Sequence, residues 1–288
     1  FAALEQPLTG RELIASVDYW LDSFKVNGEY ESFALFGDLS YDFNELFTLT
    51  GGLRYTKDEK DFGRYIAYNE YGIPLAFTEE TLVDADGNYD PVNGALGWFW
   101  QDHSWDELTS RAVLDYHVTE DVLLYASWAT GYKSGGYNSA GDTIDEGPLD
   151  SETVENVELG IKSTFFDNRV RLNGAIYDYT YENLQTQIFV PGECRPGGLG
   201  GYEFAADDVD GSGYEFDVLV LITDGLTLGA NTGKIDAEYT KSQRQEVVDG
   251  DCVVRDRSGA DFADSPSNYN VFLNFEYPFE GGAALSFS

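Results

Sequence analysis

Hydrophobic and polar residues alternate with a period of two along much of the chain. In the segment 33–41, the side chains of Phe33, Leu35 and Leu39 would share one face of an extended strand, while polar residues occupy the other face. The same alternation resumes over 47–55 after a short polar break. Two alternating runs joined by so short a break predict a β-hairpin.

The same unit recurs along the chain, and each time a short turn separates two alternating runs. Further hairpins are predicted at 108–116 with 122–132, at 157–165 with 170–176, at 214–222 with 226–230, and from 269–277 onward. A lone strand is also predicted near 14–24. The sequence therefore predicts an all-β fold of about eleven strands.

The connections between the hairpins are long, acidic and rich in Gly, Asn and Tyr. We expect external loops near 57–106, 134–152, 190–212 and 240–267. Short turns at one end of the strands and long loops at the other are typical of outer-membrane barrels, with the short turns in the periplasm. The whole range 1–288 is thus interpreted as part of a transmembrane antiparallel β-barrel.

A soluble β-sandwich or propeller would also alternate, since its strands have one apolar face. Two features favour the barrel. The predicted strands run to about nine to twelve residues, longer than the usual soluble strand of about five or six. Aromatic residues also gather beside the short turns, as expected for a membrane-interface girdle, at Tyr41, Phe43, Phe47, Phe165, Phe166, Tyr277 and Phe279.

Composition narrows the functional classes. The formal net charge is −35 and aromatic residues make up 15% of the chain. So negative a protein is a poor partner for nucleic acid, and a disordered acidic chain would lack the aromatic residues. No apolar run is long enough for a membrane-spanning helix. Because the sequence starts at Phe1 and contains no Met, we expect a mature or partial chain.

Several segments resemble the barrel of TonB-dependent receptors of the ferric-siderophore type. The resemblance is carried by Leu-Leu-Tyr-Ala-Ser-Trp-Ala-Thr-Gly-Tyr-Lys-Ser-Gly-Gly-Tyr-Asn at 123–138, by the run 152–163, by 173–185 and by Leu-Arg-Tyr-Thr at 53–56. It implies a 22-stranded barrel around an N-terminal plug, with transport energised by the TonB complex. About half of such a barrel is expected here, with the plug, the TonB box and the final strand outside this chain.

The resemblance implies active, TonB-dependent import of a scarce nutrient through the outer membrane, with a ferric siderophore or similar chelate as the leading cargo. Expected partners are the TonB complex, reached through the plug, together with outer-membrane lipid and lipopolysaccharide. Alternatives are a passive diffusion porin, TonB-dependent uptake of a carbohydrate or other non-iron nutrient, and an adhesin or lipoprotein companion. No cofactor is expected, and no nucleic-acid partner.

Five residues are candidates for ligand contact. Arg54 and Lys133 would project on the polar face, toward the lumen, and Tyr137 and Asn138 would lie where a strand leaves the membrane. Arg195 stands beside a cysteine in an expected loop. Aromatic and basic side chains suit an anionic, ring-bearing chelate. Alternatively, Tyr137 belongs to the aromatic girdle at the membrane interface, and Lys133 pairs with a neighbouring acidic residue.

The remaining polar chemistry is sparse. Cys194 and Cys252 would form one disulfide in an oxidising compartment, with free thiols or a weak metal site as alternatives. No catalytic constellation and no complete metal-ligand set is found, so an enzyme is not expected. The Asp-rich run 207–211 resembles a calcium loop but lacks the full ligand pattern, which favours a solvated turn.

The acidic composition of the expected loops bears on the cargo. Carboxylates crowd the range 58–106, with few basic residues. Such a mouth repels a free anion over a Debye length of about 8 Å at physiological salt. It favours cationic, neutral or polyhydroxylated cargo, although the charge is also explained by divalent cations that bridge to lipopolysaccharide, or by solubility.

Overall fold

The computed structural model describes residues 25–67, 96–138, 147–194, 200–262, 267–278 and 284–287. Ten strands form one sheet in chain order, each antiparallel to the next: β1 (Lys25–Asp42), β2 (Phe47–Ala67), β3 (Leu96–Thr119), β4 (Val122–Lys133), β5 (Glu152–Phe165), β6 (Val170–Val190), β7 (Gly201–Thr223), β8 (Leu226–Lys241), β11 (Ser267–Pro278) and β12 (Ala284–Phe287). Between β8 and β11, β9 (Gln243–Val248) and β10 (Asp251–Asp256) form a separate hairpin.

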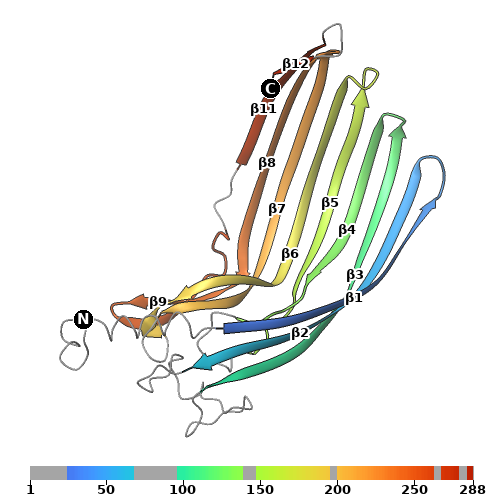
Figure 1. The fold of residues 1–288 in the computed structure, drawn as a ribbon. Helices are drawn as coiled ribbons and strands as arrows, with labels where there is room; N and C mark the ends of the chain where they lie inside the picture. Colours follow the sequence, from blue (N-terminus) through green and yellow to red (C-terminus); the bar gives the residue numbers. More distant parts are fainter. Residues whose placement is uncertain are drawn as a thin grey trace.

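The sheet is a single curved layer, with tight turns at one end and longer connections at the other (Figure 1). The five predicted hairpins are confirmed as β1–β2, β3–β4, β5–β6, β7–β8 and β11–β12. No second layer covers the predicted apolar stripe in the described part of the chain, because Phe33, Leu35 and Leu39 are 62%, 70% and 77% exposed. This arrangement is the wall of an incomplete barrel, not a sandwich.

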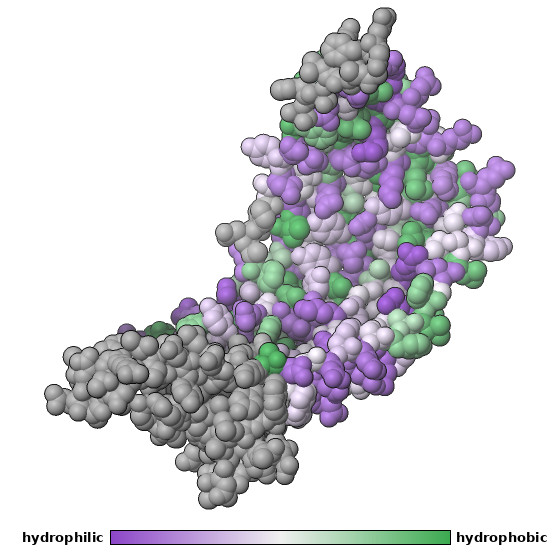
Figure 2. All heavy atoms as spheres, in the orientation of Figure 1, coloured by the Kyte–Doolittle hydropathy of each residue, from purple (hydrophilic) through white to green (hydrophobic). Residues whose placement is uncertain are grey.

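The strand register gathers apolar side chains on one face of the sheet. Leu49 of β2 lies opposite Leu114 of β3, and Leu159 of β5 lies opposite Ile176 of β6. Residues that stand directly opposite each other share a face, so this face continues across the sheet as an apolar, lipid-facing surface. The side of the molecule turned toward the reader in Figure 2 is largely hydrophilic, with scattered hydrophobic residues.

The turn end carries the aromatic residues expected of a membrane interface. The rings of Tyr41 and Phe43 meet edge to face at 5.1 Å, and Phe47 stacks on Tyr116 of β3 at 4.6 Å. Phe166, in the β5–β6 turn, is 76% exposed. Aromatic rings gathered in this way are typical of the girdles at the membrane interfaces of such barrels, and they indicate that the tight turns mark the periplasmic side.

Several strands are much longer than a bilayer requires. A transmembrane strand needs about ten residues, whereas β3 has 24 and β7 has 23. The strands therefore continue past the lipid at the end with the long connections. No helix long and apolar enough to cross a bilayer is found among the described residues.

The long strands correct the loop boundaries. The ranges 57–106 and 190–212 were predicted as loops, but β2 reaches Ala67, β3 begins at Leu96 and β7 begins at Gly201. The extensions carry polar residues on both faces, so alternation fails although the backbone ladder continues. The range 240–267 contains the β9–β10 hairpin, whereas the described parts of 134–152 are irregular up to the start of β5. The strand predicted near 14–24 lies outside the described residues.

Candidate functional site

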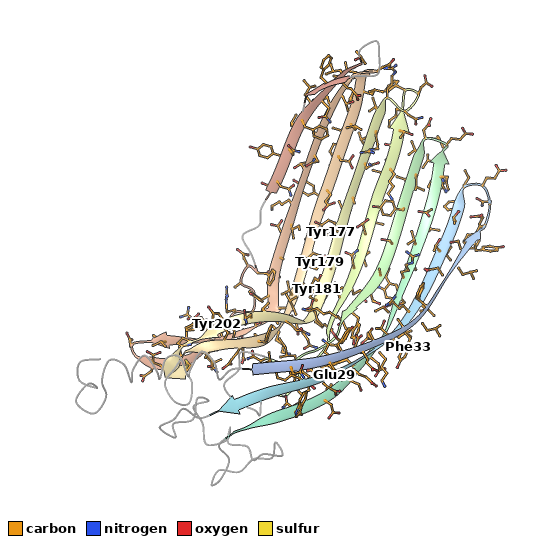
Figure 3. The ribbon with its side chains drawn as sticks, in the orientation of Figure 1. Glu29, Phe33, Tyr177, Tyr179, Tyr181 and Tyr202 are labelled. Atoms are coloured by element: carbon orange, nitrogen blue, oxygen red, sulfur yellow. A yellow bond between two sulfur atoms is a disulfide. The ribbon has the colours of Figure 1, made fainter. Side chains whose placement is uncertain are left out.

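Three tyrosines form a ladder on the polar face of β6. Tyr177, Tyr179 and Tyr181 occupy alternate positions, and their ring centroids are 6.4 Å and 5.6 Å apart (Figure 3). Glycines lie opposite two of them on β7, where a Cβ at Gly213 or Gly211 would come within 2.7 Å of a ring. The glycines allow the rings to lie flat against the wall, so the ladder offers π surface to the lumen.

A cavity of about 490 Å³ lies on the sheet beside this ladder. Its wall mixes charges and amides. The Lys162 ammonium lies 5.1 Å from the Tyr125 ring centroid, and Asn173 donates to Asp217 at 3.1 Å. The polar and aromatic part of its lining includes Tyr125, Lys162, Asn173, Tyr177, Glu215 and Asp217. Such a wall offers both hydrogen-bond donors and acceptors to a molecule in the lumen.

The connection between β4 and β5 folds back onto β2 and β3. Lys60 Nζ donates to the carbonyl oxygen of Gly135 at 2.5 Å, and Trp105 Nε1 donates to that of Leu149 at 3.0 Å. The ammonium lies 5.6 Å and 5.4 Å from the ring centroids of Tyr30 and Trp105. We call Tyr30, Lys60 and Trp105 the loop seat, because their side chains hold both ends of the connection near the wall.

Tyr137 and Asn138 lie in this seated segment, and both make internal contacts. The Tyr137 ring stacks on Phe62 with centroids 5.0 Å apart and planes within 9°. Its hydroxyl is buried without a hydrogen-bond partner among the described residues. Asn138 is buried, and its side-chain amide donates to the carbonyl oxygen of Tyr202 on β7 at 3.1 Å. Asn138 thus links the seated segment to the far side of the mouth.

The basic candidates fall in different places. Lys133 lies at the end of β4, and its ammonium is 3.0 Å from a carboxylate oxygen of Glu152, the first residue of β5. Arg54 lies apart on β2, where its guanidinium carbon is 5.6 Å from the Phe36 ring centroid and its Nε donates to Thr56 at 3.0 Å. Lys133, Tyr137 and Asn138 thus lie at the end of β4 and in the segment that follows it, each with a different partner, whereas Arg54 lies apart on β2. Arg195 lies outside the described residues.

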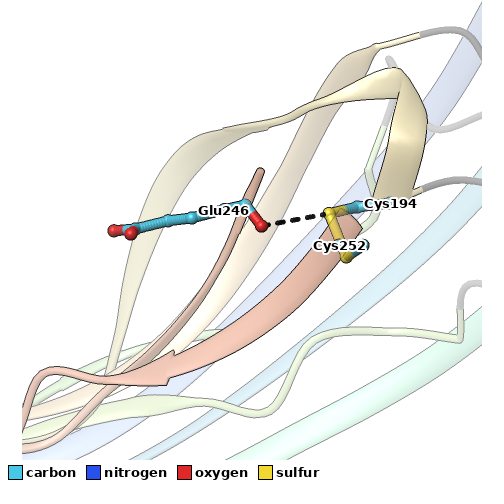
Figure 4. Close-up of a disulfide and its surroundings, with 3 residues drawn as sticks. All are labelled: Cys194, Glu246 and Cys252. Atoms are coloured by element: carbon cyan, nitrogen blue, oxygen red, sulfur yellow. Dashed lines mark hydrogen bonds between the residues drawn. A yellow bond between two sulfur atoms is a disulfide. The ribbon is translucent and has the colours of Figure 1, made fainter. Parts of the chain in front are cut away.

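The two cysteines join distant connections at the external end. Cys194 closes a short 3-10 turn, η2 (Gly192–Cys194), after β6, and its disulfide partner Cys252 lies in β10 with a Cα–Cα distance of 5.0 Å (Figure 4). The Cys194 sulfur also lies 3.8 Å from the carbonyl oxygen of Glu246. The bridge therefore fastens the β9–β10 hairpin to the end of β6.

A buried ion pair makes a second connection between the same parts. Arg244 of β9 donates to both carboxylate oxygens of Asp207 in β7, at 2.8 Å and 2.6 Å, and Thr186 of β6 donates to one of them. Burial raises the pKa of Asp207, but the hydrogen bonds from Arg244 and Thr186 outweigh it and hold this pKa below its ordinary value. Here the expectation of a solvated turn at 207–211 is wrong, because the run lies within β7 and Asp207 is fully buried.

An exposed pair of aromatic rings lies on the extended part of β6 and β7. Phe189 faces Tyr202 across the ladder with centroids 5.5 Å apart, and their exposed fractions are 57% and 52%. Because the register shifts between Tyr181 and Leu184, both rings lie on the outward face of the sheet, opposite the tyrosine ladder. Sequence reasoning missed this pair because Tyr202 falls in the range 190–212, which is expected to be a loop but belongs to β7 from Gly201 onward. In the described ranges, no group of three His, Cys, Asp or Glu residues is placed to hold a metal ion.

Comparison with known proteins identifies relatives of the whole wall. Residues 9–287 match the family described as TonB dependent receptor-like, beta-barrel. A probable TonB-dependent siderophore receptor, PiuA of Acinetobacter baumannii, is 27% identical over 165 residues, which cover 55% of this chain and 21% of that protein.

Solved structures with the same fold include the ferric yersiniabactin uptake receptor FyuA of Yersinia pestis, with a TM-score of 0.64 at 18% identity over 91% of this chain and 33% of that one. The copper transporter OprC has a TM-score of 0.55 at 11% identity, over 90% of this chain and 41% of that one. The chain therefore spans only a third or less of PiuA and FyuA, and likenesses at this identity establish the fold without the cargo.

Proposed function

This chain belongs to the TonB-dependent receptor family as part of its β-barrel, and on that premise we propose that the whole protein imports a ferric chelate across the bacterial outer membrane. The family match over residues 9–287 is the observation that carries the proposal. The siderophore receptor PiuA, named for such a cargo, supports iron over other nutrients.

The site supports capture at the mouth followed by passage along a polar wall. The loop seat lies on the extended ends of the strands, beyond the lipid-facing band. The tyrosine ladder lies on the lumen face of β6. The energy for passage would come from TonB through a plug encoded outside this chain, and lipid and lipopolysaccharide would surround the barrel.

The five candidate residues remain proposed cargo contacts. Lys133 and Asn138 would have to exchange an internal partner, Glu152 or the Tyr202 carbonyl, for a contact with cargo. Tyr137 would offer a ring edge and its hydroxyl, whereas Arg54 would act deeper on the wall. Arg195 would act from the connection that the disulfide holds.

The test is uptake of radioactive iron by cells that lack the receptor and its redundant transporters, complemented with the full-length gene. We expect uptake of at least one ferric chelate that requires both the receptor and TonB. A TonB-deficient strain with the receptor present is the matched control. If the receptor increased uptake equally with and without TonB, the protein would be a passive pore and the proposal would be lost.

A further inference from the structure

Strands β3 and β4 part from each other above the lipid-facing band. Their ladder ends where Arg111 lies opposite Ala129, although both strands continue beyond it. From there β3 stays paired with β2, and β4 stays paired with β5. At the point of separation the Thr130 hydroxyl oxygen accepts a hydrogen bond from the Ser110 backbone N–H at 2.9 Å, in place of a ladder bond. We call this opening between β3 and β4 the seam.

A cavity of about 490 Å³ lies at the seam, on the outward side of the wall. Most of its lining belongs to outward positions of four strands: Ser110, Thr130, Thr153, Glu155, Thr180 and Glu182. Glu155, for example, lies opposite Thr130 and Thr180 and shares the face of Leu159, because residues at even spacing in a strand point the same way. The strands that line it, β3 to β6, are internal to the sheet, so its walls do not depend on the open edges at β1 and β12.

The cavity lies at the height where the strands leave the bilayer. Between Val170 at the start of β6 and Thr180, the strand has run the roughly ten residues that a bilayer requires. The outward residues just below the cavity on β5 are apolar, and Val157 is 46% exposed. Trp128, opposite Val157, lies one step below Thr130 on the same face, and tryptophan is enriched at bilayer interfaces. Acyl chains that cover the lipid-facing band therefore end directly beneath the cavity.

The lining of the cavity is complementary to a molecule rich in hydroxyl groups. Its side chains present hydroxyls and carboxylates, among them Thr130, Thr153, Thr180, Glu107, Glu155 and Glu182. The Thr180 hydroxyl donates to Asp210 at 2.8 Å, which fixes its direction and leaves its lone pairs to accept. Carboxylates accept hydrogen bonds from the hydroxyls of a sugar, whereas they repel a phosphate. A sugar ring therefore suits this cavity better than a phosphate group does.

We infer that the seam cavity binds the sugar headgroup of a glycolipid of the outer leaflet, lipopolysaccharide, whose acyl chains lie on the apolar band below. The hydroxyls and carboxylates of the cavity bind the sugar hydroxyls, and Trp128 and Val157 contact the chains. This site goes beyond the import function, and it is the same for any cargo because the cavity lies outside the lumen.

The experiment uses the purified full-length receptor in detergent micelles and native mass spectrometry, which counts the lipids that stay bound. The probes are deep-rough lipopolysaccharide, which carries sugars above its acyl chains, and phosphatidic acid, which has acyl chains and a phosphate but no sugar. We expect lipopolysaccharide to bind at least about tenfold more tightly. Equal affinity for the two lipids would overturn the recognition of a sugar.

Variants locate the binding at the seam. Thr153→Val with Thr180→Val removes two cavity hydroxyls and keeps side chains that favour strands, so the affinity for lipopolysaccharide should fall by about tenfold. The matched control is Ser40→Ala with Thr50→Val, which removes two hydroxyls from the lumen face and should leave the affinity unchanged. Unchanged affinity in the seam variant, or an equal loss in the control, would overturn the assignment to the seam.

Chelation of divalent cations separates direct recognition of the sugar from a cation bridge. A bridge between carboxylates and lipid phosphates is lost when EDTA is added, whereas hydrogen bonds to a sugar persist. We expect the preference for lipopolysaccharide over phosphatidic acid to survive EDTA, and its loss would overturn the inference. The import function is tested separately by iron uptake, which does not depend on this lipid preference.

Discussion

Arg244 and Asp207 form a two-pronged ion pair between β9 and β7, with both nitrogen–oxygen distances below 3 Å and the Asp207 side chain completely buried. Removal of one partner leaves the other charge buried without compensation, which typically destabilises a protein by about 3–5 kcal/mol. Arg244→Ala should therefore loosen the attachment of the β9–β10 hairpin to β7, measured by faster proteolysis of that hairpin in the folded receptor.

A matched control for that variant lies on the same hairpin. Arg255 pairs with Glu246 at 3.0 Å, but their side chains are 60% and 41% exposed. An exposed pair contributes at most about 1 kcal/mol, so Arg255→Ala should change the cleavage rate little. Equal sensitivity of the two variants would contradict the structural role assigned to the buried pair.

The same pair predicts how the attachment of the β9–β10 hairpin to β7 responds to acid. The pKa of Asp207 is lowered in the fold, so its stabilising contribution is fully present above the unfolded value of about 4 and is lost as the pH falls through the folded pKa. Hydrogen exchange in β9 should be unchanged between neutral pH and about pH 5 and should accelerate below about pH 4, after correction for intrinsic exchange. In Asp207→Asn this acid-dependent step should disappear, whereas persistence of the step would assign it to another carboxylate.

The packing of the β4–β5 connection against the loop seat requires a glycine at position 135. A Cβ at Gly135 would lie 1.8 Å from the carbonyl oxygen of Leu149 and 2.3 Å from Trp105 Nε1, whereas at Gly136 the nearest atom would be 3.9 Å away. Gly135→Ala should unseat the connection and expose Trp105, seen as a red shift of tryptophan emission. Gly136→Ala is the control and should leave the spectrum unchanged. A seated connection in Gly135→Ala would refute the close packing.

The fold was predictable where lipid contacts one face of a strand and water contacts the other. The stripe of Phe33, Leu35 and Leu39 follows directly from period two, and so do the hairpins. Above the membrane the alternation is lost, because water contacts both faces of each strand. The runs around Asp207 in β7 and Arg64 in β2 carry no alternation, and only the backbone ladder reveals them as strand.

The candidate site was predictable only in part, for a related reason. Alternation predicts that Lys133 faces the lumen, and the sequence allows either a cargo contact or a pairing with a neighbouring acid, which in the structure is Glu152. The Phe189–Tyr202 pair depends on a register shift upstream, and the Lys60–Gly135 contact joins residues 75 positions apart. Contacts of this kind depend on curvature and loop return, which local patterning does not encode.

The lipid-facing assignment predicts opposite outcomes for substitutions on the two faces of β2. Leu53 lies on the apolar face and is 59% exposed, whereas Thr50 lies on the polar face, where its hydroxyl meets that of Ser40 at 2.8 Å. An arginine on the lipid side near the bilayer midplane costs about 2–4 kcal/mol. Leu53→Arg should lower the folded fraction of the receptor in membranes, measured by heat-modifiable gel mobility, and Thr50→Arg should not. A reversal would invert the assignment of the faces.

The disulfide should stabilise the attachment of the β9–β10 hairpin to the end of β6 without affecting the barrel wall. Cys194 and Cys252 are 58 residues apart, and closing a loop of that length in the unfolded chain is worth up to about 4 kcal/mol. The Arg244–Asp207 pair still joins the same parts after reduction, so Cys194→Ser with Cys252→Ser should accelerate proteolysis near residue 192 by less than that bound implies. Addition of Arg244→Ala should produce a larger increase than the two separate effects combined, because the connections hold one unit in parallel. Strictly additive rates would mean that the disulfide and the ion pair stabilise independent segments.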